Sequence, residues 1–126
     1  MDPQQVLFSL LKTSLENAGY DVYEDGLPPK NTPYPFIYLG NTQQIDDILK
    51  HGITGYIYQT VHVWSNKPRE RGTFSNILFD VKNVASNIGE SKGFSFMLEN
   101  VDQTILPDNT TDVPLLHGVL DLKFDY

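Results

Sequence analysis

Apolar side chains recur at helical spacing near the start of the chain. Asp2 is suited to cap a helix, Pro3 fits its first turn, and Gln5 stands where a capping box would place it. Gly19 follows as the expected stop. A second run with the helical period covers residues 74–88, directly before another glycine. The pattern therefore predicts two amphipathic helices.

A strict alternation of side chains predicts a strand over residues 56–64. One face of this strand carries apolar residues and a glutamine, and the other carries aromatic and polar residues. The first set is Ile57, Gln59, Val61 and Val63, and the second is Tyr56, Tyr58, Thr60, His62 and Trp64. Because neither face is plainly polar, we expect this strand at the centre of a sheet, with both of its sides covered.

Shorter patterns predict further strands at residues 20–23, 36–39, 94–106 and 116–124. Residues 24–35 hold a glycine and several prolines and are predicted to form a surface loop. Residues 41–55 fit a short helical turn or an excursion at a sheet edge equally well. We interpret them, together with residues 107–114, as long loops. Gly118 interrupts the inward face of the last strand, which indicates a bulge or a close approach.

The order of elements predicts an α+β fold. Two amphipathic helices need one face of a sheet to bury against, which favours a two-layer sandwich with a mostly antiparallel sheet and both helices on one face. We find no linker that would divide the chain, so residues 1–126 are expected to form a single domain. The other sheet face would then be free for a partner, which makes four residues candidates for a protein interface: Tyr56, Tyr58, His62 and Trp64.

Composition narrows the partners that this chain could have. The 126 residues carry 9 Lys and Arg against 16 Asp and Glu, a net charge of −7 at pH 7. This charge argues against specific binding of nucleic acid, which relies on basic side chains that neutralise phosphates.

Cysteine is absent, which excludes a disulfide framework, a thiolate metal site and a cysteine nucleophile. The first apolar run has no basic leader, so neither a signal peptide nor a membrane span is expected.

Motifs that carry chemistry are not evident. The histidines His51, His62 and His117 lack the spacing of a zinc site, although His62 and His117 could be neighbours across the sheet. The Asp46-Asp47 doublet lacks the opposed placement that acid–base catalysis requires. We therefore predict no catalytic, cofactor-binding or metal-binding residue and no cofactor, and an ordinary enzyme is disfavoured. The one basic cluster, Lys67, Arg69 and Arg71, is interpreted as a solvated helix entry.

Three strand motifs, in this order and spacing, point to a known family. They are Pro-Tyr-Pro-Phe-Ile at residues 33–37, Val-His-Val-Trp-Ser at residues 61–65 and His-Gly-Val-Leu at residues 117–120. With the N-terminal helix before them, they cover nearly the whole chain. The chain resembles the tail-completion or head–tail joining proteins of long-tailed bacteriophages, a family that includes tail terminators. None of the motifs is a catalytic signature.

The resemblance implies structural work in a virion. Proteins of this family form a ring, commonly hexameric, at the head-proximal end of the phage tail. One side of the ring meets the tail tube protein, and the other meets head-completion or connector proteins. Assembly of such a particle in the bacterial cytoplasm agrees with a chain that has no cysteine.

Two other functions fit the residues. The chain could be another phage connector, such as a head-completion protein, that uses the same aromatic sheet face as a binding surface. A small hydrolase with a carboxylate site is the remaining alternative, because carboxylate chemistry leaves weak traces in a sequence. Within the favoured family, a terminator that halts tube growth and an adaptor that docks the tail to the head both fit.

Overall fold

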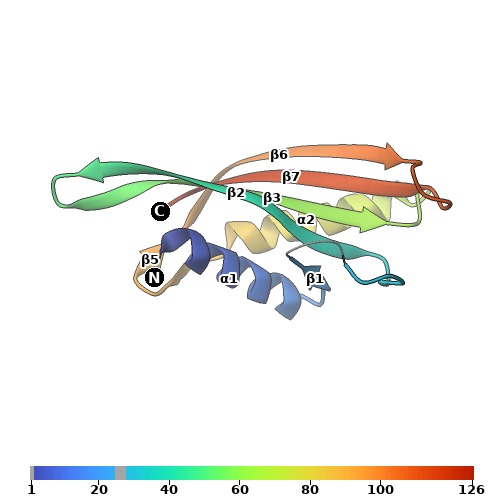
Figure 1. Cartoon of the computed structure of the whole chain (residues 1–126), viewed down its shortest axis with the longest axis horizontal. Coiled ribbons are helices and arrows are strands. Elements are labelled where there is room, and N and C mark those ends of the chain that lie inside the picture. Colours follow the sequence, from blue (N-terminus) through green and yellow to red (C-terminus); the bar gives the residue numbers. More distant parts are fainter. Residues whose placement is uncertain (1, 25–27) are drawn as a thin grey trace.

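The computed structural model describes residues 2–24 and 28–126. Two helices and a mixed set of long and short strands follow one another along the chain (Figure 1). In order they are α1 (Pro3–Asn17), β1 (Val22–Tyr23), β2 (Phe36–Leu49), β3 (Gly52–Ser65), α2 (Arg71–Ser86), β4 (Glu90–Ser91), β5 (Phe94–Ser95), β6 (Met97–Asp108) and β7 (Leu115–Asp125).

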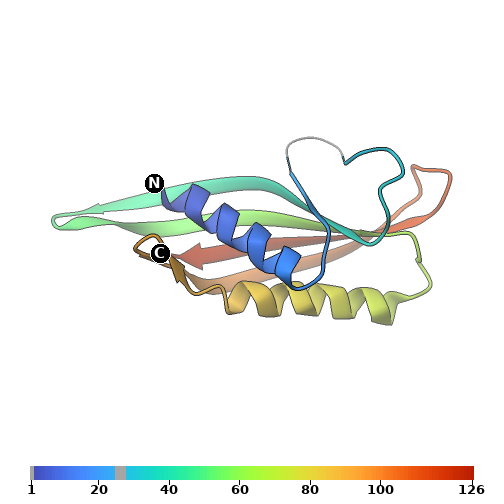
Figure 2. The same ribbon diagram turned by 90° about the horizontal axis from the view of Figure 1, so that it is seen from below.

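The main sheet has the strand order β1-β2-β3-β7-β6. Strand β1 pairs in parallel with β2, and every other pair in this sheet is antiparallel. Both helices lie on the same face of the sheet, as the two perpendicular views show (Figures 1 and 2). The predicted α+β architecture is thus confirmed, and so is the central position of β3.

Helix α1 begins as the sequence predicts but without the full capping box. The Asp2 carboxylate accepts a hydrogen bond of 3.0 Å from the backbone N–H of Gln4. The side chain of Gln5 donates to the Ser9 hydroxyl instead of reaching back to the cap. After the helix, Gly19 adopts a φ of 100°, a conformation that few other residues reach without strain.

The core lies between the two helices and the inner sheet face. It is continuous, and at Gly118 of β7 helix α2 lies close against the sheet. A Cβ atom at this position would lie 2.8 Å from Leu78 Cδ2 and 3.1 Å from Phe74 Cζ, both on α2. The close approach predicted from the sequence is therefore present. The buried side chains of the helices are Val6, Leu7, Leu11, Leu15, Phe74, Leu78, Val81 and Ala85.

Gln59 is a polar residue on the otherwise apolar inner face of β3. A register shift in β2 explains why a polar side chain is buried there. The pairing of β2 with β3 shifts between Leu39 and Thr42. The Gln59 amide donates to the backbone carbonyls of Gly40 and Thr60, at 3.3 and 2.9 Å. Although the side chain is only 2% exposed, it satisfies carbonyls that the irregular pairing leaves free.

The prediction of a long loop at residues 41–55 is wrong. Strands β2 and β3 continue through it as one antiparallel hairpin that closes with the pair Leu49 and Gly52. Because β7 joins β3 only from Tyr56 onward, residues 46–55 form a two-stranded ribbon that extends beyond the rest of the sheet (Figures 1 and 2). We call this ribbon, residues 46–55, the arm.

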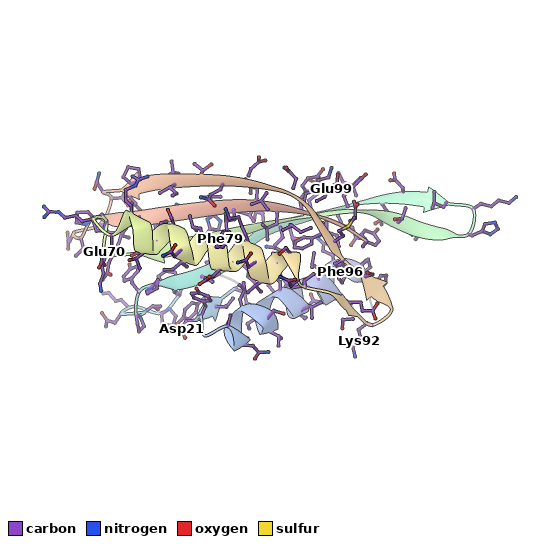
Figure 3. All side chains as sticks on the ribbon, turned by 180° about the vertical axis from the view of Figure 1, so that it is seen from behind. Asp21, Glu70, Phe79, Lys92, Phe96 and Glu99 are labelled. Carbon is purple, nitrogen blue, oxygen red and sulfur yellow. The ribbon has the colours of Figure 1, made fainter. Side chains whose placement is uncertain are left out.

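The predicted strand at residues 94–106 is also different in the structure. Its first residues form β5, which pairs with β4 in a separate small hairpin with Lys92 at its turn (Figure 3). Phe96 is buried between β5 and β6, and β6 then runs as far as Asp108. The second predicted loop is correspondingly shorter and connects β6 to β7 through residues 109–114.

Candidate protein–protein interface

The outer face of the main sheet is the face that neither helix covers (Figures 1 and 2). The four candidate residues Tyr56, Tyr58, His62 and Trp64 are all in β3, at alternate positions whose neighbours Ile57, Val61 and Val63 are buried in the core. Tyr58 is exposed, and the other three are half-buried. The expectation that both sides of β3 are covered is therefore wrong for the chain by itself.

A cluster of three rings occupies one end of this face. The Trp64 indole and the His117 imidazole are stacked, with ring centroids 3.8 Å apart and an angle of 6° between the planes. His62 Nδ1 and His117 Nε2 are 2.8 Å apart, within hydrogen-bond distance. The two histidines are thus neighbours across β3 and β7, as the sequence suggested.

Burial lowers the pKa of both imidazoles. For His62 the nearby Asp121 carboxylate partly opposes this effect. For His117 the proximity of His62 lowers the pKa further, and Asp108 opposes it. A hydrogen bond between two imidazole rings requires at least one neutral ring as acceptor, so the lowered pKa values and the short N···N distance agree.

A second cluster lies toward the arm. The Lys123 ammonium is 4.1 Å from the Tyr56 ring centroid and 5.8 Å from that of Tyr58. The same ammonium is 3.5 Å from a carboxylate oxygen of Glu99. A hydrogen bond from Thr60 to Asp121 lies between the two clusters. The four candidate residues therefore share one face but belong to two groups, separated by a polar pair.

A groove borders the first cluster and was not predicted from the sequence. It has a volume of about 670 Å³. Its apolar walls come from Tyr34, Phe36, Trp64 and Leu115, while Asp108 contributes a carboxylate. The Pro-Tyr-Pro-Phe motif was its one signal in the sequence, because Tyr34 and Phe36 supply adjacent ring walls with centroids 5.3 Å apart.

The arm is the other feature that sequence reasoning missed. Three large apolar side chains are exposed together in the arm: Ile48 at 83%, Ile53 at 60% and Leu49 at 57%. Ile48 and Ile53 are paired across the two strands and lie on the same face of the ribbon. The isoleucines on either side of a lysine–histidine–glycine turn were the available signal for a hairpin.

The structure brings together few groups that could do chemistry. Across residues 2–24 and 28–126 there is no group of three or more His, Asp or Glu side chains placed to hold a metal ion. His51 lies in the arm, away from the other two histidines. The basic residues Lys67, Arg69 and Arg71 are exposed before and at the start of α2, where Lys67 pairs with Glu70 at 3.9 Å. Within the described part of the chain, neither helix has the length and hydropathy needed to cross a membrane.

Comparison with known proteins gives matches among solved structures. One is a chain in the virion of a native gene transfer agent particle, with a TM-score of 0.59 and 14% identity over 98% of this chain and 95% of that one. Another is the gp17 protein of bacteriophage SPP1, with a TM-score of 0.59 and 18% identity over 98% of this chain and 93% of that one. No family model matches the chain, and no curated protein matches it in sequence.

These matches define the class of fold. The chain is similar, over nearly its whole length, to proteins of a bacteriophage and of a gene transfer agent particle. The resemblance to phage proteins that the sequence indicated is thus confirmed at the level of the fold. Because the matched chains are covered almost completely, the likeness includes their full architecture and not a shared fragment.

Proposed function

We propose that this chain is a structural protein of a phage virion that forms a ring at the head-proximal end of the tail and joins the tail to the head. The observation that carries the proposal is the end-to-end similarity to the SPP1 gp17 protein and to a chain of a virion particle. A protein with this role works by binding other proteins, and a chain with large uncovered surfaces suits it.

The partners follow from the proposed position. A ring subunit contacts copies of itself on two sides through different patches, because head-to-tail contacts close rings. It also meets the tail tube protein on one side of the ring and a head-completion or connector protein on the other. The outer sheet face, with the aromatic residues that interface cores favour, is our candidate for one of these contacts.

Disruption of the gene in the phage that carries it tests the proposal. We expect the mutant to give DNA-filled heads and separate tails when lysates are viewed by electron microscopy, and we expect plasmid-borne wild-type protein to restore joined particles. Free tails of normal length would indicate an adaptor, and tails of abnormal length would indicate a terminator. Joined, infectious particles at the normal yield from the mutant would refute the proposal.

A further inference from the structure

The chain has two uncovered apolar features at opposite ends of its long axis. The arm projects from one end, and the connections that border the groove, before β2 and between β6 and β7, lie at the other (Figures 1 and 2). One feature is a projection and the other is a hollow. Because they are at opposite ends, the arm of a chain does not reach the groove of the same chain.

The arm by itself lacks the support that a stable ribbon needs. Residues 46–55 form strand pairs only within the hairpin. At the base of the arm, the Thr54 hydroxyl donates to the Tyr126 carbonyl and the Tyr126 N–H donates to the Gly55 carbonyl. The Asp46 carboxylate accepts hydrogen bonds from the Tyr126 hydroxyl and the Gln44 amide. An isolated two-stranded ribbon is marginally stable in water. The exposed side chains Ile48, Leu49 and Ile53 at its end would therefore gain from burial against another surface.

The groove has the size and lining for such side chains. Its volume of about 670 Å³ lies within the range of about 300–1,000 Å³ that is typical of pockets for compact ligands. Tyr34, Phe36 and Trp64 offer ring surfaces on which branched aliphatic side chains can pack. A few aliphatic side chains at the end of a narrow ribbon match this site better than a flat protein surface would.

Charges at the two ends are complementary as well. The turn of the arm carries Lys50 and His51, and the groove includes the carboxylate of Asp108. Nearer its base the arm carries Asp46 and Asp47, and Lys30 also lines the groove. Lys50 at the turn of the arm and Asp108 in the groove are thus groups of opposite sign.

We infer that the arm of one copy inserts its apolar end into the aromatic groove of the next copy. A projection on one end of a chain that fits a hollow on the other end makes a heterologous contact, which repeats from copy to copy and closes into a ring when the rotation allows. This inference rests on the ring assembly proposed above and assigns the surfaces that hold neighbouring subunits together.

The absence of cysteine in the natural chain makes disulfide cross-linking a direct test. Leu49→Cys places a thiol at the end of the arm, and Thr111→Cys places one at the exposed edge of the groove. After mild oxidation of the double variant, in concentrated purified protein and in particles, we expect a ladder on denaturing gels with steps of 14.3 kDa. A mixture of the two single variants should give dimers and nothing larger, because each pair can form only one bridge.

The matched control pairs Leu49→Cys with Phe79→Cys. Phe79 is 58% exposed on α2, on the helix side of the sheet (Figure 3), and should give no ladder. Absence of linked species in both samples of the arm–groove variant would overturn the inference. Dimers from Leu49→Cys alone, or a link from the arm to a different virion protein, would overturn it as well.

The cross-linking result can be distinguished from the test of the proposed virion role. Complementation by the wild-type chain and its presence in purified particles test the virion role without any cross-link. If the wild-type chain joins heads to tails and the double variant forms no ladder, the virion role stands and the arm–groove contact fails. If the ladder forms in purified protein and the wild-type chain is absent from particles, the contact stands and the virion role fails.

Discussion

Gly118 lets the central part of β7 lie directly against α2. A Cβ atom at this position would press against Leu78 and Phe74, which are both fully buried in the core. Gly72, in the first turn of α2, has no neighbour within 4 Å of its would-be Cβ. The same substitution should therefore have opposite effects at the two glycines.

We predict that Gly118→Ala lowers the free energy of unfolding by about 1–3 kcal/mol, the usual effect of overpacking a core. Gly72→Ala should leave it unchanged or raise it by up to about 1 kcal/mol, because alanine favours the helix. Urea denaturation followed by circular dichroism measures both. Equal stability of the two variants would contradict the close approach of α2 to β7.

The histidine pair gives the outer face a dependence on pH. In the folded chain the pKa of both His62 and His117 lies below its ordinary value, mainly because burial disfavours the charged ring. The unfolded chain, with histidine pKa values of about 6.5, therefore binds protons first as the pH falls. The stability that comes from the neutral pair is fully present above this value and is lost as the pH falls below it.

We predict that the wild-type chain loses stability between pH 7.5 and 5.5 and that the double variant His62→Gln/His117→Gln loses less over the same range. Carboxylates away from the pair contribute to both proteins alike, so the difference between the two curves belongs to the histidines together with their neighbours Asp108 and Asp121. Urea midpoints at several pH values provide the measurement. Parallel curves for the two proteins would show that the histidine pair does not titrate as described.

At the scale of elements, the helices and the core strands could be predicted and the arm could not. The helices and β3 bury one side of a regular pattern, so their period is visible in the sequence, as at Leu7, Leu11 and Leu15. The side chains of Ile48, Leu49 and Ile53 are all exposed, and in the sequence they stand among Asp47, Lys50 and His51 without a regular alternation. Without a buried face there is no alternation to read, and the hairpin was interpreted as a loop.

The groove was missed for a different reason. Tyr34 precedes β2 and Phe36 begins it, Trp64 is the last residue but one of β3, and Leu115 begins β7. The register of the sheet is therefore needed to bring them together. A single sequence gives no register between strands that are far apart. The candidate residues of β3 needed only the alternation within one strand, which explains why their common face could be predicted.

We predict that shortening the arm leaves the body of the protein intact. Replacement of residues 48–53 by Asn-Gly would close the hairpin with a two-residue turn after the pair Asp47 and Thr54. Because the removed side chains are exposed and pair only with one another, the Tm should change by less than about 3 °C. In complementation, the yield of joined particles should fall at least about tenfold, as expected when an interface anchor is removed.

Thermal unfolding and particle counts by electron microscopy check the two halves of this prediction. A matched control replaces the exposed Phe79 by serine, which removes a similar apolar surface from the helix side. This control should complement like the wild type. Full activity of the shortened chain would show that the arm has no part in assembly.

At the scale of the whole molecule, the two sides of the sheet have different roles. The inner side holds the core, and the outer side carries Tyr58, which is 37% exposed, beside half-buried aromatic residues. Aromatic rings that gather on an uncovered strand at the centre of a sheet are typical of a surface that contacts another protein. We therefore expect a partner to cover this face in the particle.

We predict that Tyr58→Asp weakens assembly without unfolding the chain. The change removes an aromatic ring from the contact and buries a carboxylate there, while the nearby Lys123 already pairs with Glu99, and we expect binding to weaken by several-fold to about a hundredfold. The side chain of Tyr58 is outside the core, so the free energy of unfolding should fall by less than about 1 kcal/mol.

Phe79→Asp, on the helix side, is the matched control and should assemble normally. The yield of joined particles from complemented lysates measures the effect, and a wild-type yield from Tyr58→Asp would remove this residue from the interface.

The position of the chain in the particle tests the account most directly. Purified particles that carry an epitope-tagged copy of the chain can be labelled with gold-coupled antibody and viewed by electron microscopy. The account predicts gold at the junction of head and tail, and on the head-proximal end of free tails. Gold along the tail shaft, at the distal tip or on the capsid alone, or particles that bind no antibody after disruption with detergent, would contradict it.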